Sequence, residues 1–122
     1  MPPMKTLFLA TAVTILALTE QALAHAHLKT ATPAADSTIK QSPSVLDLGF
    51  TESLNLKFSA ATVTGPGRKA IKIGTAALAE GDKTLTIPVS DTLAPGKYTV
   101  KWHVLSTDGH KTNGSYSFTV AP

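Results

Sequence analysis

Hydrophobic and polar residues alternate strictly in several short runs of this 122-residue chain. The clearest runs lie at residues 45–50, 54–58, 84–89, 97–104 and 115–120, and shorter ones lie at 27–31, 61–65 and 70–74. A period of two residues indicates strands with one buried face. Segments rich in Gly, Pro and Asp separate the runs and are typical of turns. Because no convincing helix accompanies them, the pattern predicts an all-β fold, an immunoglobulin-like Greek-key β-sandwich of about seven strands.

Two details refine this prediction. Pro88 interrupts one run, and because proline cannot donate a backbone hydrogen bond, we expect an edge strand or a bulge there. The aromatic residues after position 24 all fall on faces that we expect to form the core: Phe50, Phe58, Tyr98, Trp102, Tyr116 and Phe118. The sequence therefore predicts no exposed aromatic platform.

The first 24 residues have the order of a secretory signal peptide. Lys5 precedes an apolar run over residues 6–18, and an Ala-x-Ala triplet occupies residues 22–24. The run is shorter than the roughly 20 apolar residues of a membrane-spanning helix. We expect cleavage after Ala24, which leaves residues 25–122 as one small domain. A second triplet over residues 24–26 leaves cleavage after Ala26 as an alternative.

Composition excludes several kinds of chemistry. The chain has no cysteine, which excludes disulfides, thiolate metal sites and cysteine nucleophiles. Its two methionines, Met1 and Met4, both lie in the predicted signal, so the exported domain has no thioether ligand either. The net charge of +3 comes from scattered residues with no basic run, so we expect no nucleic-acid binding.

Cleavage after Ala24 would make His25 the first residue of the mature chain. A free N-terminal histidine can bind one metal ion through its α-amino nitrogen and its ring Nδ1 together. An amine and an imidazole both release their protons to a metal near neutral pH. Nitrogen donors in a tetragonal plane suit Cu(II). The uncleaved chain cannot form this chelate, because the amine is then part of a peptide bond.

Further ligands could come from the segment "STDGHKT" between the last two predicted strands. Asp108 and His110 are two residues apart, so in an extended segment they point the same way. Taken alone, the pair is equally compatible with a polar turn, since Asp-Gly is a common turn dipeptide. His103 lies beside Trp102 on the opposite strand face, and we expect it at the surface. His27 could face solvent or a partner.

The chain resembles the CopC family of periplasmic copper-resistance and copper-homeostasis proteins, including its YobA-like members. The resemblance covers essentially all of residues 25–122. It is carried by "HAHL" at 25–28, "TPAADSTI" at 32–39, "LDLGFTESL" at 46–54, "FSAATVTGP" at 58–66 and "LAPGKYTVKWHVLSTDGHKTNGSYSFTV" at 93–120.

The resemblance implies a Greek-key sandwich that binds one Cu(II) in the periplasm. It assigns the N-terminal ligand to His25 and the Asp-x-His pair to Asp108 and His110. Glu52 matches an acidic residue near the site, either as a ligand or beside one. The resemblance also implies a CopD-type copper transporter of the inner membrane as partner. Some members add a Met-rich Cu(I) site, which this chain lacks.

These observations favour a copper buffer or carrier over an enzyme, and we expect a monomer. One alternative is an oxidative enzyme with the same N-terminal chelate, like the copper polysaccharide mono-oxygenases. A second is a tail in which Cu(II) is held by the amine, two backbone amides and the ring of His27, independently of the fold. A third is an adhesion or interaction sandwich without metal, which would leave His25 and the Asp-Gly-His segment unexplained.

Overall fold

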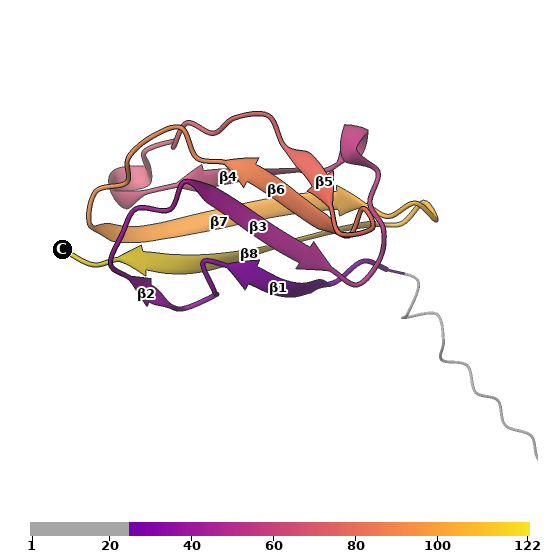
Figure 1. The fold of residues 1–122 in the computed structure, drawn as a ribbon, viewed down its shortest axis with the longest axis horizontal. Helices are drawn as coiled ribbons and strands as arrows, with labels where there is room; N and C mark the ends of the chain where they lie inside the picture. Colours follow the sequence, from indigo (N-terminus) through magenta and orange to yellow (C-terminus); the bar gives the residue numbers. More distant parts are fainter. Residues whose placement is uncertain (1–24) are drawn as a thin grey trace, which may run out of the picture.

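Eight strands form two four-stranded sheets that pack face to face (Figure 1). The structure is a computed structural model and describes residues 25–122. One sheet has the order β1 (Leu28–Thr32), β3 (Val45–Phe50), β6 (Thr84–Pro88) and β5 (Ala77–Ala79). The other has the order β2 (Thr38–Ile39), β8 (Lys111–Val120), β7 (Gly96–Leu105) and β4 (Ala60–Thr64). The predicted all-β sandwich is confirmed, with eight strands in place of about seven.

The core forms where the apolar faces of the two sheets meet. Along β3 and β7 every second residue is buried, as the alternation predicts. Phe50 of the first sheet meets Trp102 of the second edge to face, with ring centroids 5.0 Å apart. Tyr98 and Phe118 pack within the second sheet at 5.7 Å. Aromatic contacts of this kind add to the stabilisation from burial alone.

The prediction of a strand over residues 54–58 is wrong. Leu54 is buried, but Leu56–Phe58 forms a short 3-10 turn, η2, in which Asn55 caps the backbone N–H of Lys57. The side chain of Asn55 thereby offers the backbone an alternative to a sheet ladder. As a consequence the side chain of Phe58 is 52% exposed, and the prediction that every aromatic residue is in the core is wrong at this position.

Three smaller differences concern the edges of the sheets. Residues 70–74 contribute only isolated bridges, and β2 and β5 are short strands that alternation does not reveal. Pro88 lies neither on an edge strand nor in a bulge. It ends β6, a central strand, beyond the last residue that β5 pairs, so its missing N–H breaks no ladder.

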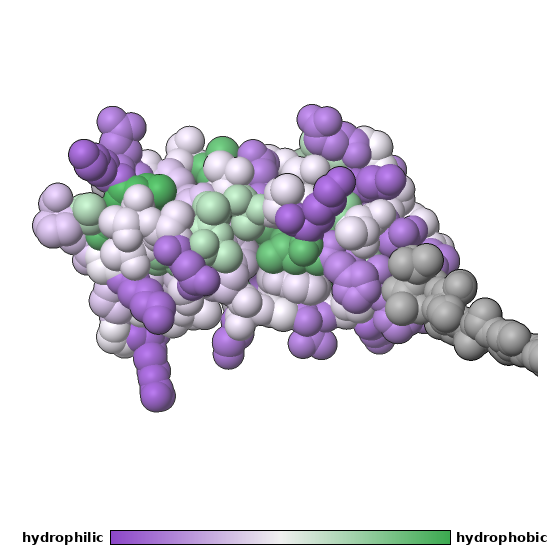
Figure 2. Space-filling model, turned by 90° about the horizontal axis from the view of Figure 1, so that it is seen from below, coloured by the Kyte–Doolittle hydropathy of each residue, from purple (hydrophilic) through white to green (hydrophobic). Residues whose placement is uncertain are grey.

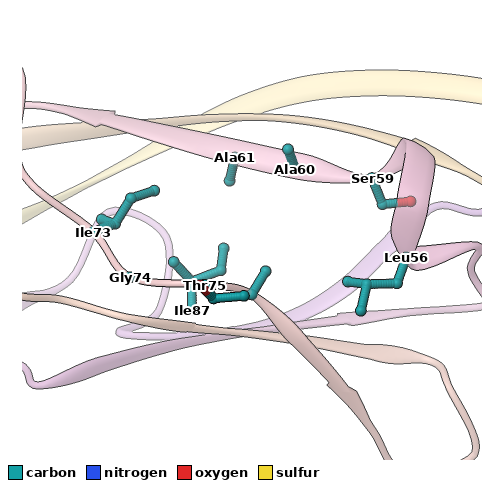
Figure 3. Close-up of a pocket in the computed structure, with 9 residues that line it drawn as sticks. Leu56, Ser59, Ala60, Ala61, Ile73, Gly74, Thr75 and Ile87 are labelled. Atoms are coloured by element: carbon teal, nitrogen blue, oxygen red, sulfur yellow. The ribbon is translucent and has the colours of Figure 1, made fainter.

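The surface between these elements is mostly polar. Figure 2 shows apolar residues on one side of the molecule as separate patches among hydrophilic ones. A hollow of about 320 Å³ opens between β4 and the 73–76 segment (Figure 3), and its lining of small and aliphatic residues offers no metal ligand. A second short turn, η3 (Pro66–Arg68), lies far along the chain from the predicted ligands.

Within residues 25–122, no helix is long and apolar enough to cross a membrane. The predicted signal peptide, residues 1–24, lies outside the described residues.

Candidate metal centre

Three of the four histidines meet at one end of the sandwich. The described chain begins at the end where the turn between β7 and β8 lies (Figure 1). The ring centroids of His25 and His110 are 4.6 Å apart, with an angle of 30° between the ring planes. The ring of His27 also lies near that of His25, with centroids 6.5 Å apart. The fold therefore brings His25 close to a residue that is distant in the sequence.

Ala26 anchors the N-terminal segment in the core. Its side chain has no exposed surface, although both neighbouring residues reach the surface. Its carbonyl oxygen accepts a hydrogen bond of 2.7 Å from the hydroxyl of Thr112, two residues after His110. Because Thr112 is the second residue of β8, the strand that leaves the turn, this bond ties the segment of His25 to the segment that carries His110.

Thr51 fixes the same segment from the other sheet. Its hydroxyl accepts the N–H of His27 at 2.9 Å and donates to the carbonyl oxygen of His25 at 3.4 Å. Its own N–H donates to the carbonyl oxygen of His27 at 3.0 Å. Sequence reasoning missed both Thr51 and Thr112, because a threonine that holds a distant backbone segment leaves no local pattern.

The turn that carries Asp108 and His110 is organised around Ser106. This serine is 1% exposed, and its hydroxyl donates to Oδ1 of Asp108. The N–H of Ser106 donates to the carbonyl oxygen of His110, and the N–H of Gly109 donates back to the carbonyl oxygen of Ser106, both at 2.9 Å. Gly109 has a φ of +93°, a conformation that favours glycine. The Ser-x-Asp spacing was the available signal for Ser106, since such residues often bond within turns.

Asp108 and His110 form a pair. Oδ1 of Asp108 lies 3.2 Å from Nδ1 of His110, and both side chains are nearly half exposed. The hydrogen bond from Ser106, and then the one from His110, hold the pKa of Asp108 below its ordinary value. Both contacts engage Oδ1 of the carboxylate, and the second one also engages Nδ1 of the His110 ring. Oδ2 and Nε2 take no part in them and remain available to an ion.

Glu52 lies between two residues whose backbones bond the two ligand-bearing segments, the 25–27 segment and the turn between β7 and β8. It directly follows Thr51, and it precedes Ser53, whose carbonyl oxygen accepts the N–H of Thr107 at 3.0 Å. No hydrogen bond joins its half-buried side chain to the predicted ligands among the described residues. His103 lies on the exposed face of β7, opposite Asn113 of β8, as predicted for a surface residue.

Side chains alone do not complete a metal site here. Among residues 25–122 no group of three or more His, Asp and Glu side chains is arranged to hold an ion. The predicted ligand set consists of three side chains, those of His25, Asp108 and His110, and of the α-amino group of a cleaved His25 as a fourth donor. In the prediction, that nitrogen is free to bind a metal only after cleavage after Ala24.

Comparison with known proteins identifies the family. The model of the CopC domain matches residues 28–121. "Protein YobA" of Escherichia coli K12 is 45% identical over 104 residues, which cover 84% of each chain. "Copper resistance protein C" of Escherichia coli is 37% identical over 106 residues, which cover 81% of this chain and 83% of that protein.

Solved structures agree with this assignment. CopC from Methylosinus trichosporium OB3b superposes with a TM-score of 0.73 at 33% identity, covering 80% of this chain and 95% of that one. PcoC, described as a methionine-rich copper resistance protein from Escherichia coli, superposes with a TM-score of 0.72 at 34% identity, covering 79% and 98%. Fold, sequence and family model agree, and this chain belongs to the CopC family.

Proposed function

We propose that this protein is a periplasmic Cu(II)-binding protein of copper homeostasis, which buffers or carries one ion per mature chain. The ligands are the amine and ring of His25, the ring of His110 and the carboxylate of Asp108. The observation that carries the proposal is the 4.6 Å approach of His25 to His110, since the two are far apart in the sequence. Glu52 follows Thr51 at the same end and is a nearby acidic group.

The position of Ala26 supports cleavage after Ala24. Cleavage after Ala26 would remove a fully buried residue and the carbonyl oxygen that Thr112 binds. Cleavage after Ala24 keeps both contacts and leaves His25 as the first residue, beside His110. We therefore assign residues 1–24 to the signal peptide and residues 25–122 to the copper-binding domain.

The donor set suits storage or delivery of Cu(II) better than oxidation chemistry. Three nitrogens and one carboxylate oxygen fill a tetragonal plane, and hard donors stabilise Cu(II) against reduction. A mono-oxygenase would also need a substrate surface, yet five of the six aromatic residues after position 24 are buried. Phe58 alone among them is exposed, which is too little for a sugar-binding platform.

The fold-independent tail is disfavoured by the backbone of His27. That arrangement requires the amide nitrogens of Ala26 and His27 as metal ligands. The N–H of His27 instead donates to the hydroxyl of Thr51 at 2.9 Å. Binding copper in the tail mode would break this bond and withdraw Ala26 from the core. Both changes cost free energy, and binding at the folded site requires neither of them.

A CopD-type transporter of the inner membrane is the partner we propose for delivery, on the family relationship. The exposed end of the sandwich, where His25, His27 and His110 meet, is where such a partner would approach. We propose that the protein acts as a monomer.

The test is a competition titration of the mature protein, starting at His25, with Cu(II) and a chelator of known affinity. We expect one tight site. His25→Ala should abolish it, whereas His103→Ala, which alters an exposed histidine on β7, should leave the affinity within twofold. Loss of the site in His103→Ala, or its survival in His25→Ala, would contradict the proposal.

A further inference from the structure

We propose that a pocket beside η2, together with the lysines on the outer face of the β2–β8–β7–β4 sheet, is a docking surface for an acidic protein segment that inserts one apolar side chain. The inference gives the chemistry of a delivery partner, and only its connection to copper rests on the proposed function. It uses Phe58 and exposed lysines, to which the copper site gives no role.

The pocket lies where η2 meets the second sheet. It has a volume of about 380 Å³, within the range of roughly 300–1,000 Å³ that ligand pockets have. η2 contributes Lys57 and Phe58, and β7 and β8 contribute His103, Lys111 and Asn113. The side chain of Phe58 is 52% exposed, and Nζ of Lys57 lies 5.7 Å from its ring centroid. The pocket therefore joins an apolar surface to cationic groups, and no Asp or Glu lines it.

Hydrogen bonds from both ends of η2 hold it against β7. The N–H of Asn55, the residue that caps η2, donates to the carbonyl oxygen of Leu105 at 2.8 Å. The N–H of Leu105 donates to the hydroxyl of Ser59, just after η2, at 3.1 Å. The wall that carries Phe58 is therefore fixed before anything binds, which lowers the entropic cost of docking.

The sheet face that continues from the pocket is cationic. Its four strands contain Lys97, Lys101 and Lys111, all exposed, and neither Asp nor Glu. These lysines are scattered in the sequence, and the pairing of β7 with β8 places them on one face. Within residues 25–122 the only ion pair joins Asp108 to His110, so no carboxylate neutralises them. A face of one charge favours a partner of the opposite charge.

The length and polarity of this face favour a protein segment over a small anion or a membrane. The face follows β7, a strand of 10 residues and so roughly 30 Å long, which is far longer than a small anion. The other exposed residues along it are polar, among them Thr62, Asn113 and Ser115, so it offers little apolar area to a bilayer. A concave pocket beside Phe58 can be filled by one side chain, whereas a flat lipid surface would leave it empty.

The pocket adjoins the candidate metal centre. η2 and the turn between β7 and β8 lie at the same end of the sandwich (Figure 1). Lys111, which lines the pocket, directly follows His110. Thr112, which also lines it, bonds the carbonyl oxygen of Ala26. A partner docked here would lie beside the proposed copper ligands.

The experiment measures peptide binding to the metal-free mature protein by NMR with ¹⁵N labelling. The probes are the capped peptides acetyl-EEFEE-amide, acetyl-EESEE-amide and acetyl-KKFKK-amide, and vesicles of phosphatidylglycerol are tested by co-sedimentation. The variants are Phe58→Ser and Lys57→Gln. Leu56→Ser is the control within η2, since Leu56 does not line this pocket, and Lys29→Gln is the control on the other sheet. Circular dichroism checks that each protein is folded.

We expect the EEFEE peptide to shift the amide signals of η2 and of the residues around His103 and Asn113. Phe58→Ser should weaken its binding at least about fivefold and Lys57→Gln about threefold, while both controls stay within twofold. The EESEE peptide should bind at least about fivefold more weakly, and a higher ionic strength should weaken binding further.

No shift at the pocket, equal binding of the KKFKK peptide, or full binding by Phe58→Ser would overturn the inference. Co-sedimentation with vesicles that Phe58→Ser abolishes, without peptide binding, would overturn it in favour of a membrane surface. The assay contains no metal, so a failed Cu(II) titration would overturn the proposed function and not the docking surface. Both pocket variants should keep their Cu(II) affinity within twofold.

Discussion

The two segments that meet at the candidate metal centre are held in place in opposite ways. The turn from Ser106 to His110 is organised by its own hydrogen bonds, which join Ser106 to both Asp108 and His110. The segment from His25 to His27 is held entirely by other parts of the chain, through Thr51 and Thr112. One half of the site is therefore built locally, and the other half exists only when the sandwich is folded.

This difference suggests how the protein can gain a metal site on export. The turn needs no processing and presents Asp108 and His110 in the precursor as in the mature protein. The N-terminal segment needs both cleavage, which frees the amine of His25, and docking of Ala26 into the core. Under the proposed function, Cu(II) binding would therefore be coupled to both events, and metal binding would in turn stabilise the folded state.

The largest expected effect on Cu(II) affinity comes from removing a ligand of the turn from Ser106 to His110. His110→Ala should lower Cu(II) affinity at least about 100-fold, since it removes a nitrogen from the copper plane. Competition titration measures the change. The free energy of unfolding of the metal-free protein should hardly change, because His110 is an exposed turn residue. Unchanged affinity would mean that the N-terminal segment binds copper by itself.

A smaller effect is expected from loosening the half that depends on the fold. Thr51→Val keeps the shape of the side chain but removes the hydroxyl that bonds His25 and His27. We expect a loss of about 1 kcal/mol in the free energy of unfolding and about tenfold in Cu(II) affinity. Thr62→Val, at an exposed position of β4, is the control for the same substitution. Equal results for both variants would show that Thr51 does not position the ligands.

A still smaller effect should follow from weakening the turn's own network. Ser106→Ala removes the largest cause of the low pKa of Asp108, so this pKa should rise toward its ordinary value. In the native protein the ionised carboxylate contributes stability above the ordinary aspartate pKa, and this contribution is lost as the pH falls through the lowered value. An NMR titration of the Asp108 carboxyl carbon in the apo protein should show the upward shift, with roughly threefold weaker Cu(II) binding.

Ser115→Ala, at an exposed position of β8, is the matched control and should leave the titration of Asp108 unchanged. No shift in Ser106→Ala would mean that His110, and not Ser106, lowers the pKa of Asp108, and a downward shift would contradict the role of Ser106 altogether.

The smallest effect on copper is expected from a change in β8, at the residue that pairs with Trp102. A side chain at Gly114 would place its Cβ 2.6 Å from the ring of Trp102. Gly114→Val should therefore destabilise the fold by about 1–3 kcal/mol, measured by thermal unfolding, while Cu(II) affinity of the folded protein stays within about threefold. Ser115 faces solvent on the same strand, so Ser115→Val should unfold at nearly the same temperature as the unmodified protein. A Gly114→Val protein that folds normally but loses copper would indicate that the core sets the ligand geometry directly.

The main strands were predictable from the sequence, because alternation of apolar and polar residues indicates directly which side chains of a strand are buried. The strands at 45–50, 84–88 and 96–105 follow it closely. It failed at residues 54–58, where the pattern is the same but the side chain of Asn55 caps a turn and leaves Phe58 exposed. A single side-chain hydrogen bond of this kind has no periodicity, so hydrophobic patterning cannot reveal it.

The candidate site was predictable in part for the same reason. His25, Asp108 and His110 carry chemistry that their residue types and positions indicate, and the family resemblance supplied the same residues. Thr51, Ser106 and Thr112 only position other groups, and their partners are fixed by pairing between distant strands. The relation of His27 to His25 depends on the burial of Ala26, which the sequence suggests only weakly.

The central claim is that export creates the Cu(II) site by freeing the amine of His25. The most direct measurement is electron paramagnetic resonance during Cu(II) titration of the mature protein, beside a form with one extra residue before His25. We predict one tight tetragonal signal with nitrogen hyperfine structure in the mature protein, and its loss in the extended form. The same signal at the same affinity in both forms would contradict the claim.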